Sequence, residues 1–202
     1  MSLDQANSIA LRHRLATAIA TVLAPVPLGV ALLGFIGWRS PHPLTGVGWG
    51  IFAAFFAAGL PFALTRRLRA NRPGGAHASW RRVAYLAIAL TSATAGITLL
   101  TLLGAPSLIT AATATMMVGL LTSLLVNTKW AISNHTAAAA GGAAILTVIL
   151  GPVVLIVLGP LVAAVAWARV TLNLHTPSQA VAGIALGAAV AAGVFALLAP
   201  SP

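Results

Sequence analysis

The feature that most constrains this chain is an uncharged apolar stretch of about 33 residues, which runs from position 136 to position 168. Roughly 20 helical residues cross the hydrocarbon core of a bilayer, so this stretch is too long for one span. The pair Gly151-Pro152 lies near its middle, and such a pair ends a helix. The stretch therefore predicts a hairpin of two helices of about 16–17 residues, which can span if they tilt or if the bilayer thins locally.

Polar clusters flank the hairpin on both sides. Residues 127–135 precede it, and residues 169–179 follow it. Because a hairpin returns the chain to the membrane face that it left, the two clusters should meet there. The residues expected together at this surface are Lys129, Ser133, His135, Arg169 and His175. Two histidines, two cations and a hydroxyl at a lipid boundary favour a phosphate site.

The composition supports a membrane location. Apolar residues make up 59% of the 202 residues and charged residues only 6%, whereas a soluble domain carries about 25% charged residues. Backbone groups find no water inside a bilayer, so the spanning segments should be helices, and the alternation typical of barrel strands is absent. We expect an all-α, polytopic bundle of six or seven transmembrane helices.

Acidic residues are almost missing, and cysteines are missing altogether. The chain has 11 Lys and Arg residues but a single acid, Asp4, and no Cys. This excludes Mg²⁺ held by carboxylate clusters, paired-carboxylate catalysis, disulfides, thiolate zinc sites and cysteine nucleophiles. We expect no metal and no cofactor. The net charge of +10 sits at the ends of spans, which favours lipid headgroups or a phosphorylated substrate over nucleic acid.

Seven apolar segments can be read along the chain, and no soluble domain or repeat separates them. The first is long enough to be an uncleaved helix, with a kink at Pro25 and Pro27, and not a signal peptide. The expected spans are 15–38, 46–64, 83–103, 108–126, the two arms of the hairpin, and 180–198. We interpret residues 1–202 as a single integral membrane domain.

The distribution of cations predicts an orientation. With seven spans, the face that holds the N-terminus also holds the loops near 66–82, 127–135 and 169–178, and 10 of the 11 cations. Only Arg39 lies on the opposite face. The positive-inside rule then places the polar clusters on the cytoplasmic face, and we expect the plasma (inner) membrane.

Phosphoryl transfer without a metal needs fixed positive donors, an in-line nucleophile and a group that protonates the leaving oxygen. Arg169 and Lys129 can supply the charge, and Arg72 of the basic loop could add a third donor. The two histidines of the clusters can divide the roles of nucleophile and acid. Ser133 and the N–H groups at the start of the next helix would add neutral donors.

The spacing of these residues resembles the type 2 phosphatidic acid phosphatase (PAP2) superfamily of membrane phosphatases and vanadium haloperoxidases. The family's third motif, S-R-x5-H-x3-D, is similar to residues 168–179, and its second motif, P-S-G-H, is similar to residues 132–135. The first motif, K-x6-R-P, is echoed by Arg72-Pro73, with Thr65 in the place of the lysine and Arg66 beside it. The resemblance covers the order of spans from about residue 60 onward.

The resemblance implies a PAP2-like helical core and a role for each matching residue. His175 would be the nucleophile that becomes phosphohistidine, and His135 the acid for the leaving group. The phosphate ligands would be Arg169, Arg72, Ser133 and the amide of Asn134, with Lys129 as a replacement for the missing lysine.

Gln179 stands where the family has an aspartate. Its side-chain carbonyl can accept the imidazole N–H and fix the tautomer, but it cannot stabilise a developing imidazolium as a carboxylate would. A structural alternative is that Gln179 caps the last helix, since it follows Pro177-Ser178, and Pro and Ser favour a helix start.

The sequence thus predicts a metal-independent membrane phosphatase that acts on a lipid phosphate. Polyprenyl phosphates or diphosphates, polyprenyl sugar-phosphates and phosphatidic-acid-like lipids form the expected class. The first alternative is a non-catalytic protein that binds or translocates a lipid phosphate, as Gln179 would allow. The second is a small transporter or channel, although intramembrane charges, which normally mark ion pathways, are lacking.

Overall fold

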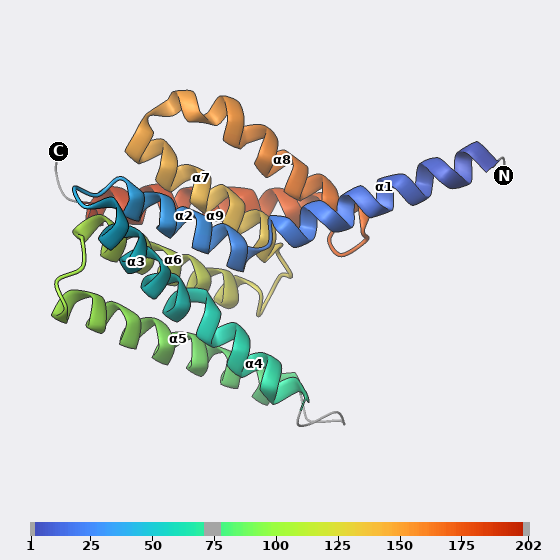
Figure 1. The fold of residues 1–202 in the computed structure, drawn as a ribbon. Coiled ribbons are helices and arrows are strands. Elements are labelled where there is room, and N and C mark those ends of the chain that lie inside the picture. The colour runs from blue at the N-terminus through green and yellow to red at the C-terminus, as the bar shows by residue number, and fades with distance from the viewer. Residues whose placement is uncertain (1–2, 71–77, 200–202) are drawn as a thin grey trace.

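A computed structural model describes residues 3–70 and 78–199 of the chain, and all their regular structure is helical. This confirms the all-α membrane bundle (Figure 1). The elements are α1 (Leu3–Val22), α2 (Pro25–Trp38), α3 (Pro43–Ala54), the π-helical turn η1 (Phe55–Gly59), α4 (Leu60–Ala70), α5 (Ala78–Leu102), α6 (Ser107–Val126), α7 (Asn134–Leu150), the 3-10 turn η2 (Pro152–Val154), α8 (Leu155–Thr171) and α9 (Pro177–Leu198).

The expected number of six or seven spans is not confirmed. By length and composition, four helical segments of the described chain can cross a membrane, or five if one bent pair counts as a span. The four are Pro43–Leu64, Ser107–Val126, Pro152–Thr171 and Pro177–Leu198. The apolar parts of α5 and α7, Ala87–Leu102 and Asn134–Leu150, are shorter.

The first span breaks at the prolines, as the sequence predicts. Helix α1 ends at Val22 and α2 begins with Pro25 at its first position, where a missing N–H costs no helical bond. The two helices differ in direction by 48°. The helix begins earlier than expected, at Leu3, so the polar N-terminal residues are helical, and α1 projects beyond the bundle (Figure 1).

The hairpin of α7 and α8 folds where expected. Helix α7 ends at Leu150, and Gly151 has a φ of 88°, a conformation that favours glycine because it has no Cβ. Helix α8 contains Pro160 and continues through it. In Figure 1, α8 arches away from the bundle near the fold and returns beside α1.

Glycines set the closest helix packing in the bundle. On α9, Gly183 and Gly187 lie four residues apart. A Cβ at Gly183 would collide with the Thr136 hydroxyl and the C=O of Ser133, at the start of α7, and a Cβ at Gly187 would collide with the backbone of Ala137. Small residues at this spacing let two membrane helices approach closely. The backbone of α7, the first helix of the hairpin, therefore packs directly against α9.

The π-helical turn η1 has an identifiable cause. The N–H of Leu60 bonds to the C=O of Phe55, five residues back, and the next bond in this register would come from Pro61, which has no N–H. Ser92 of α5 replaces it, because its hydroxyl donates to the C=O of Phe56 at 2.6 Å. This exchange fixes the turn against α5 and leaves no buried carbonyl unpaired at Phe56.

Candidate active site

The turn after α8 explains the interval between Arg169 and His175. Asn173 adopts a φ of 54°, and the N–H of Leu174 donates to the C=O of Arg169 at 3.1 Å, while the N–H of Asn173 donates to the C=O of Val170 at 2.9 Å. These two bonds form a Schellman motif, in which Asn is the usual substitute for Gly. The turn brings the chain back over the last helical turn, so the N–H of His175 also faces the C=O of Arg169, at 3.4 Å.

The start of α7 is tied to the start of α9. The N–H of Ser133 donates to the backbone C=O of Gln179 at 3.2 Å, and the hydroxyl of Thr136 donates to the C=O of Ala180 at 2.9 Å. Ser133 is the N-cap of α7, and its hydroxyl accepts the N–H of Thr136. These bonds fix the position of the two polar clusters relative to each other.

The side chain of Gln179 has two roles at the start of α9. It caps α9, as the structural alternative expects, and does so in a capping box: the Gln179 side chain accepts the N–H of Thr176 at 3.0 Å, and the Thr176 hydroxyl accepts the N–H of Gln179 at 3.3 Å. The Gln179 side chain also interacts with the imidazole of His175, as does the backbone C=O of Ala131. The cap thus holds the amide in place beside the histidine.

The structure brings His135, Arg169 and His175 together. All three line one cavity, and their charges act on one another. The Nε of Arg169 is buried and has no hydrogen-bond partner. In the whole sequence Asp4 is the only acidic side chain, so this cation has almost no carboxylate that could neutralise it. An external anion would satisfy both the charge and the free donor.

Burial and the positive charge of Arg169 both lower the pKa of His175, and its contacts with Gln179 and Ala131 partly oppose this shift. Burial is the larger cause, because a charged imidazole loses hydration there. The lowered pKa favours the neutral form of His175. A neutral imidazole has a free lone pair on one nitrogen, which a nucleophile requires.

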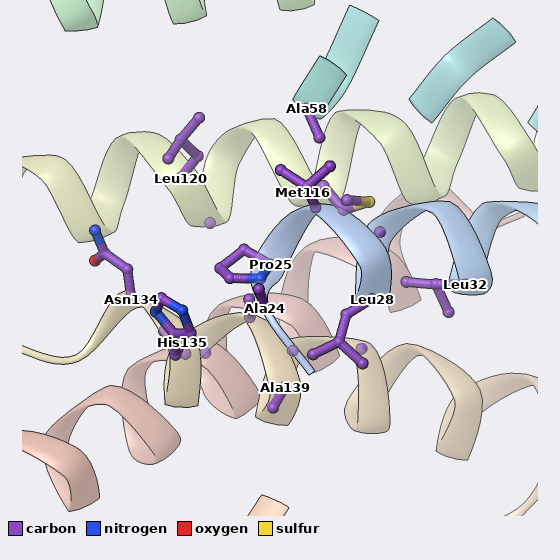
Figure 2. A pocket seen from close by; sticks show the side chains of 18 of the residues that line it. Ala24, Pro25, Leu28, Leu32, Ala58, Met116, Leu120, Asn134, His135 and Ala139 are labelled. Atoms are coloured by element: carbon purple, nitrogen blue, oxygen red, sulfur yellow. The ribbon is translucent and has the colours of Figure 1, made fainter. Parts of the chain in front are cut away.

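The cavity has a volume of about 1300 Å³ and extends from these polar residues into the apolar part of the bundle. Figure 2 shows His135 and Asn134 at one end, with Leu28 and Leu32 of α2 at the other. Residues of α2, α4, α6, α7 and α8 contribute to its walls. A polar end that continues into an apolar cavity suits a ligand with a polar head and a hydrocarbon tail.

Asn127 also lies at the site, although no motif in the sequence marks it as a ligand. Its side-chain amide donates to the Oδ1 of Asn134 at 2.9 Å and to the C=O of Ser123 at 2.8 Å. Both asparagines line the cavity. Because Asn134 accepts through its oxygen, its NH₂ group is left as a donor. The sequence does contain a signal that could have identified Asn127: it is a single Asn at the end of an apolar helix, seven residues before Asn134.

The other candidate residues lie less directly at the cavity. The side chain of Ser133 is fully buried and occupied with capping α7, so the structure presents it as a support for the neighbouring residues. Lys129 is exposed in the turn after α6 and is not among the residues that line the cavity. Arg72 lies outside the described residues. Within the described chain, no three metal-ligating side chains gather.

The family model of the PAP2 superfamily matches residues 106–201. The match covers just under half of the chain and supports membership of the PAP2 superfamily, as the motifs predict. The match takes in α6 to α9 and therefore both histidines and Arg169. Members of the superfamily are in general phosphatase-type hydrolases. No curated protein and no solved structure matches the chain significantly.

Proposed function

We propose that this protein is a membrane phosphatase that hydrolyses a lipid phosphate through a phosphohistidine at His175. The observation that carries the proposal is the buried Nε of Arg169, which has no partner and lies beside two histidines at the end of a cavity. A phosphate group would accept from this donor. The apolar remainder of the cavity supports a lipid as the carrier of that phosphate.

The reaction would proceed in two displacements. In the first, the neutral imidazole of His175 attacks phosphorus, the bond from phosphorus to the lipid oxygen breaks, and His135 gives that oxygen a proton. In the second, water attacks the phosphohistidine, His135 takes a proton from it, and the N–P bond breaks. Inorganic phosphate leaves and His175 is free again.

The surrounding residues would stabilise the charge of the transferring phosphoryl group. Arg169 contributes a fixed cation, and the amide of Asn134 contributes neutral donors, which act strongly in a site with little water. Lys129 and Arg72 are proposed as further cations, and Ser133 as a support for the start of α7. Gln179 would hold the tautomer of His175, in the place that an aspartate has in the family.

We further propose that the site works on the cytoplasmic face of the plasma membrane and without a metal. Several long apolar helices make the chain an integral membrane protein, and the cation distribution supports this orientation. A cytoplasmic site favours a lipid phosphate made inside the cell. Polyprenyl phosphates and diphosphates, polyprenyl sugar-phosphates and phosphatidic-acid-like lipids remain the proposed class.

The test is phosphate release by the purified protein from a panel of these lipids, with excess chelator present. We expect release by the unaltered protein and a loss of about a thousandfold or more in His175→Ala and in Arg169→Ala, since a nucleophile or a charged donor is removed. His13→Ala, a histidine on exposed α1, is the matched control and should keep full activity. If the folded protein binds these lipids but releases no phosphate from any of them, a non-catalytic binding or translocating function replaces this proposal.

A further inference from the structure

The cavity reaches far beyond the candidate phosphate site. It touches α7 from His135 to Leu146, α8 from Arg169 to Leu158 and α6 from Asn127 to Thr115. At 1.5 Å of rise per residue, each of these intervals spans about 17 Å. This is more than half of the hydrocarbon thickness of a bilayer, about 30 Å.

Along this length, the walls of the cavity offer few polar groups that could bind a lipid headgroup. Thr21 and Thr115 line the cavity, but their hydroxyls donate to carbonyls of their own helices, at 2.8 Å in both cases. On the α7 side, the lining from position 137 to position 143 consists of Ala and Gly residues, such as Ala139 and Gly142, and Ile145 and Leu146 follow them. Small apolar side chains leave room along the helix, and that room suits hydrocarbon.

The width of the cavity points to a broad tail. A volume of about 1300 Å³ over a length of about 17 Å corresponds to a mean cross-section of roughly 75 Å², close to that of an α-helix 10 Å across. A single straight methylene chain is much thinner than a helix and would leave voids, which packed interiors avoid. A branched polyprenyl chain, or two acyl chains side by side, would fill the space better.

Residues outside the family match complete the wall. Pro25, Leu28 and Leu32 of α2 face the cavity from one side, and Ala58 of the π-helical turn reaches it from another (Figure 2). The Ser92 bond to the C=O of Phe56 fixes this turn, so the wall has a definite shape. The fit to the tail therefore depends on a part of the chain that the family model does not cover.

We propose that the cavity is the tail site of the lipid phosphate, and that α2 and the π-helical turn make it select tails broader than one straight chain. This inference rests on the proposed function, because it assumes that the phosphate occupies the polar end. It adds the tail class and the residues that select it.

The first experiment compares kcat/KM for monophosphates that differ only in their tails. The substrates are a long-chain polyprenyl phosphate, a two-chain phosphatidic acid, a single-chain lysophosphatidic acid and the short geranyl phosphate. We expect the two broad tails to be preferred over the single straight chain by about tenfold or more, from their greater apolar burial. Equal use of the single straight chain would overturn the proposed selection.

The second experiment fills the cavity. A Cβ at Gly119 meets no atom within 4 Å, so Gly119→Leu can place its side chain in the cavity without a clash. We expect a loss of about tenfold or more with the broad tails and less than about twofold with geranyl phosphate. Gly193→Leu is the control, because Gly193 is equally uncrowded, exposed on α9 and outside the cavity. Unchanged activity of Gly119→Leu with broad tails would contradict the tail site.

A third measurement does not depend on catalysis or on the folding of a variant. A phosphatidic acid with a diazirine near the end of one acyl chain is cross-linked to the unaltered protein in vesicles, and the labelled peptides are identified. The tail site predicts label on residues 24–35 and 115–124. Label only on the outer surface of the bundle would overturn the inference even in an active enzyme, whereas the expected label without any phosphate release would refute the proposed function alone.

Discussion

At the scale of single residues, the interval between Arg169 and His175 is a property of a helix end. Arg169 is the residue whose carbonyl closes the Schellman motif, and His175 is the first residue after it. The turn thus sets where His175 lies relative to Arg169. The spacing R-x5-H therefore has a structural reason in the backbone as well as a chemical one in the side chains.

Asn173 provides a test of this reading. Its left-handed conformation costs roughly 1–2 kcal/mol for an ordinary residue, more for a β-branched one, and nothing for glycine. We expect Asn173→Gly to keep activity and thermal stability in detergent. Asn173→Val should lose about tenfold or more in kcat/KM because the turn no longer places His175. Equal activities of the two variants would show that the turn does not position the site.

The pH dependence of catalysis tests the state of His175. Since burial and Arg169 lower its pKa from the ordinary value of 6.5, the loss of activity on the acidic side should come at a pH below 6.5. Gln179→Glu keeps the capping box and places a carboxylate beside the imidazole, which should raise the pKa and move the acidic limb of kcat/KM up by about one to two pH units. Ser178→Glu, with the same charge on an exposed neighbour, should move it less. An acidic limb that Gln179→Glu leaves in place would remove Gln179 from its proposed role.

At the scale of helices, the sequence was informative about breaks and much less so about cavities. The fold at Gly151-Pro152 and the kink before Pro25 could be predicted, because glycine and proline act on their own backbone. The π-helical turn could not, since it depends on Ser92, 36 residues away from the carbonyl that it serves. Asn127 was missed for the same kind of reason, because its side chain bonds to Asn134 on another helix.

The packing of α9 on α7 can be tested with one matched pair of substitutions. Gly187→Ala should lower the free energy of unfolding by about 1–3 kcal/mol, because the new Cβ would meet the backbone of Ala137. Gly193→Ala, on the same helix but in open space, should be neutral or slightly stabilising. The measurement is the thermal midpoint of both proteins in detergent. A Gly187→Ala protein as stable as Gly193→Ala would mean that the close approach is not needed.

At the scale of the whole molecule, the chain combines a family part with an N-terminal part that the family model leaves out. The links before α7 and before α9 lie at the same end of the bundle, and the link between α2 and α3 lies at the other end (Figure 1). The family part carries the histidines and Arg169, whereas α2 and η1 complete the cavity. The motifs in the sequence predicted that the C-terminal part carries the histidines and Arg169. The contribution of α2 and η1 to the cavity became visible only in the three-dimensional packing.

The proposed orientation can be tested in cells, because the chain has no cysteine and single-cysteine variants are therefore unambiguous. A membrane-impermeant thiol reagent added from outside should label Ser40→Cys, between α2 and α3, and should label Thr128→Cys, before α7, only after the membrane is opened. Ser40 is partly exposed and Thr128 is exposed. The reverse pattern would place the site on the outer face.

The central claim is that His175 carries the phosphoryl group during turnover. The most direct measurement is rapid acid-free quenching of the purified protein with a lipid phosphate labelled at phosphorus, followed by identification of the labelled peptide. The account predicts an acid-labile, alkali-stable phosphoryl group on His175 that forms and decays at the rate of phosphate release and is absent from His175→Ala. Phosphate release that continues in His175→Ala, or at full rate with no label on His175, would contradict it.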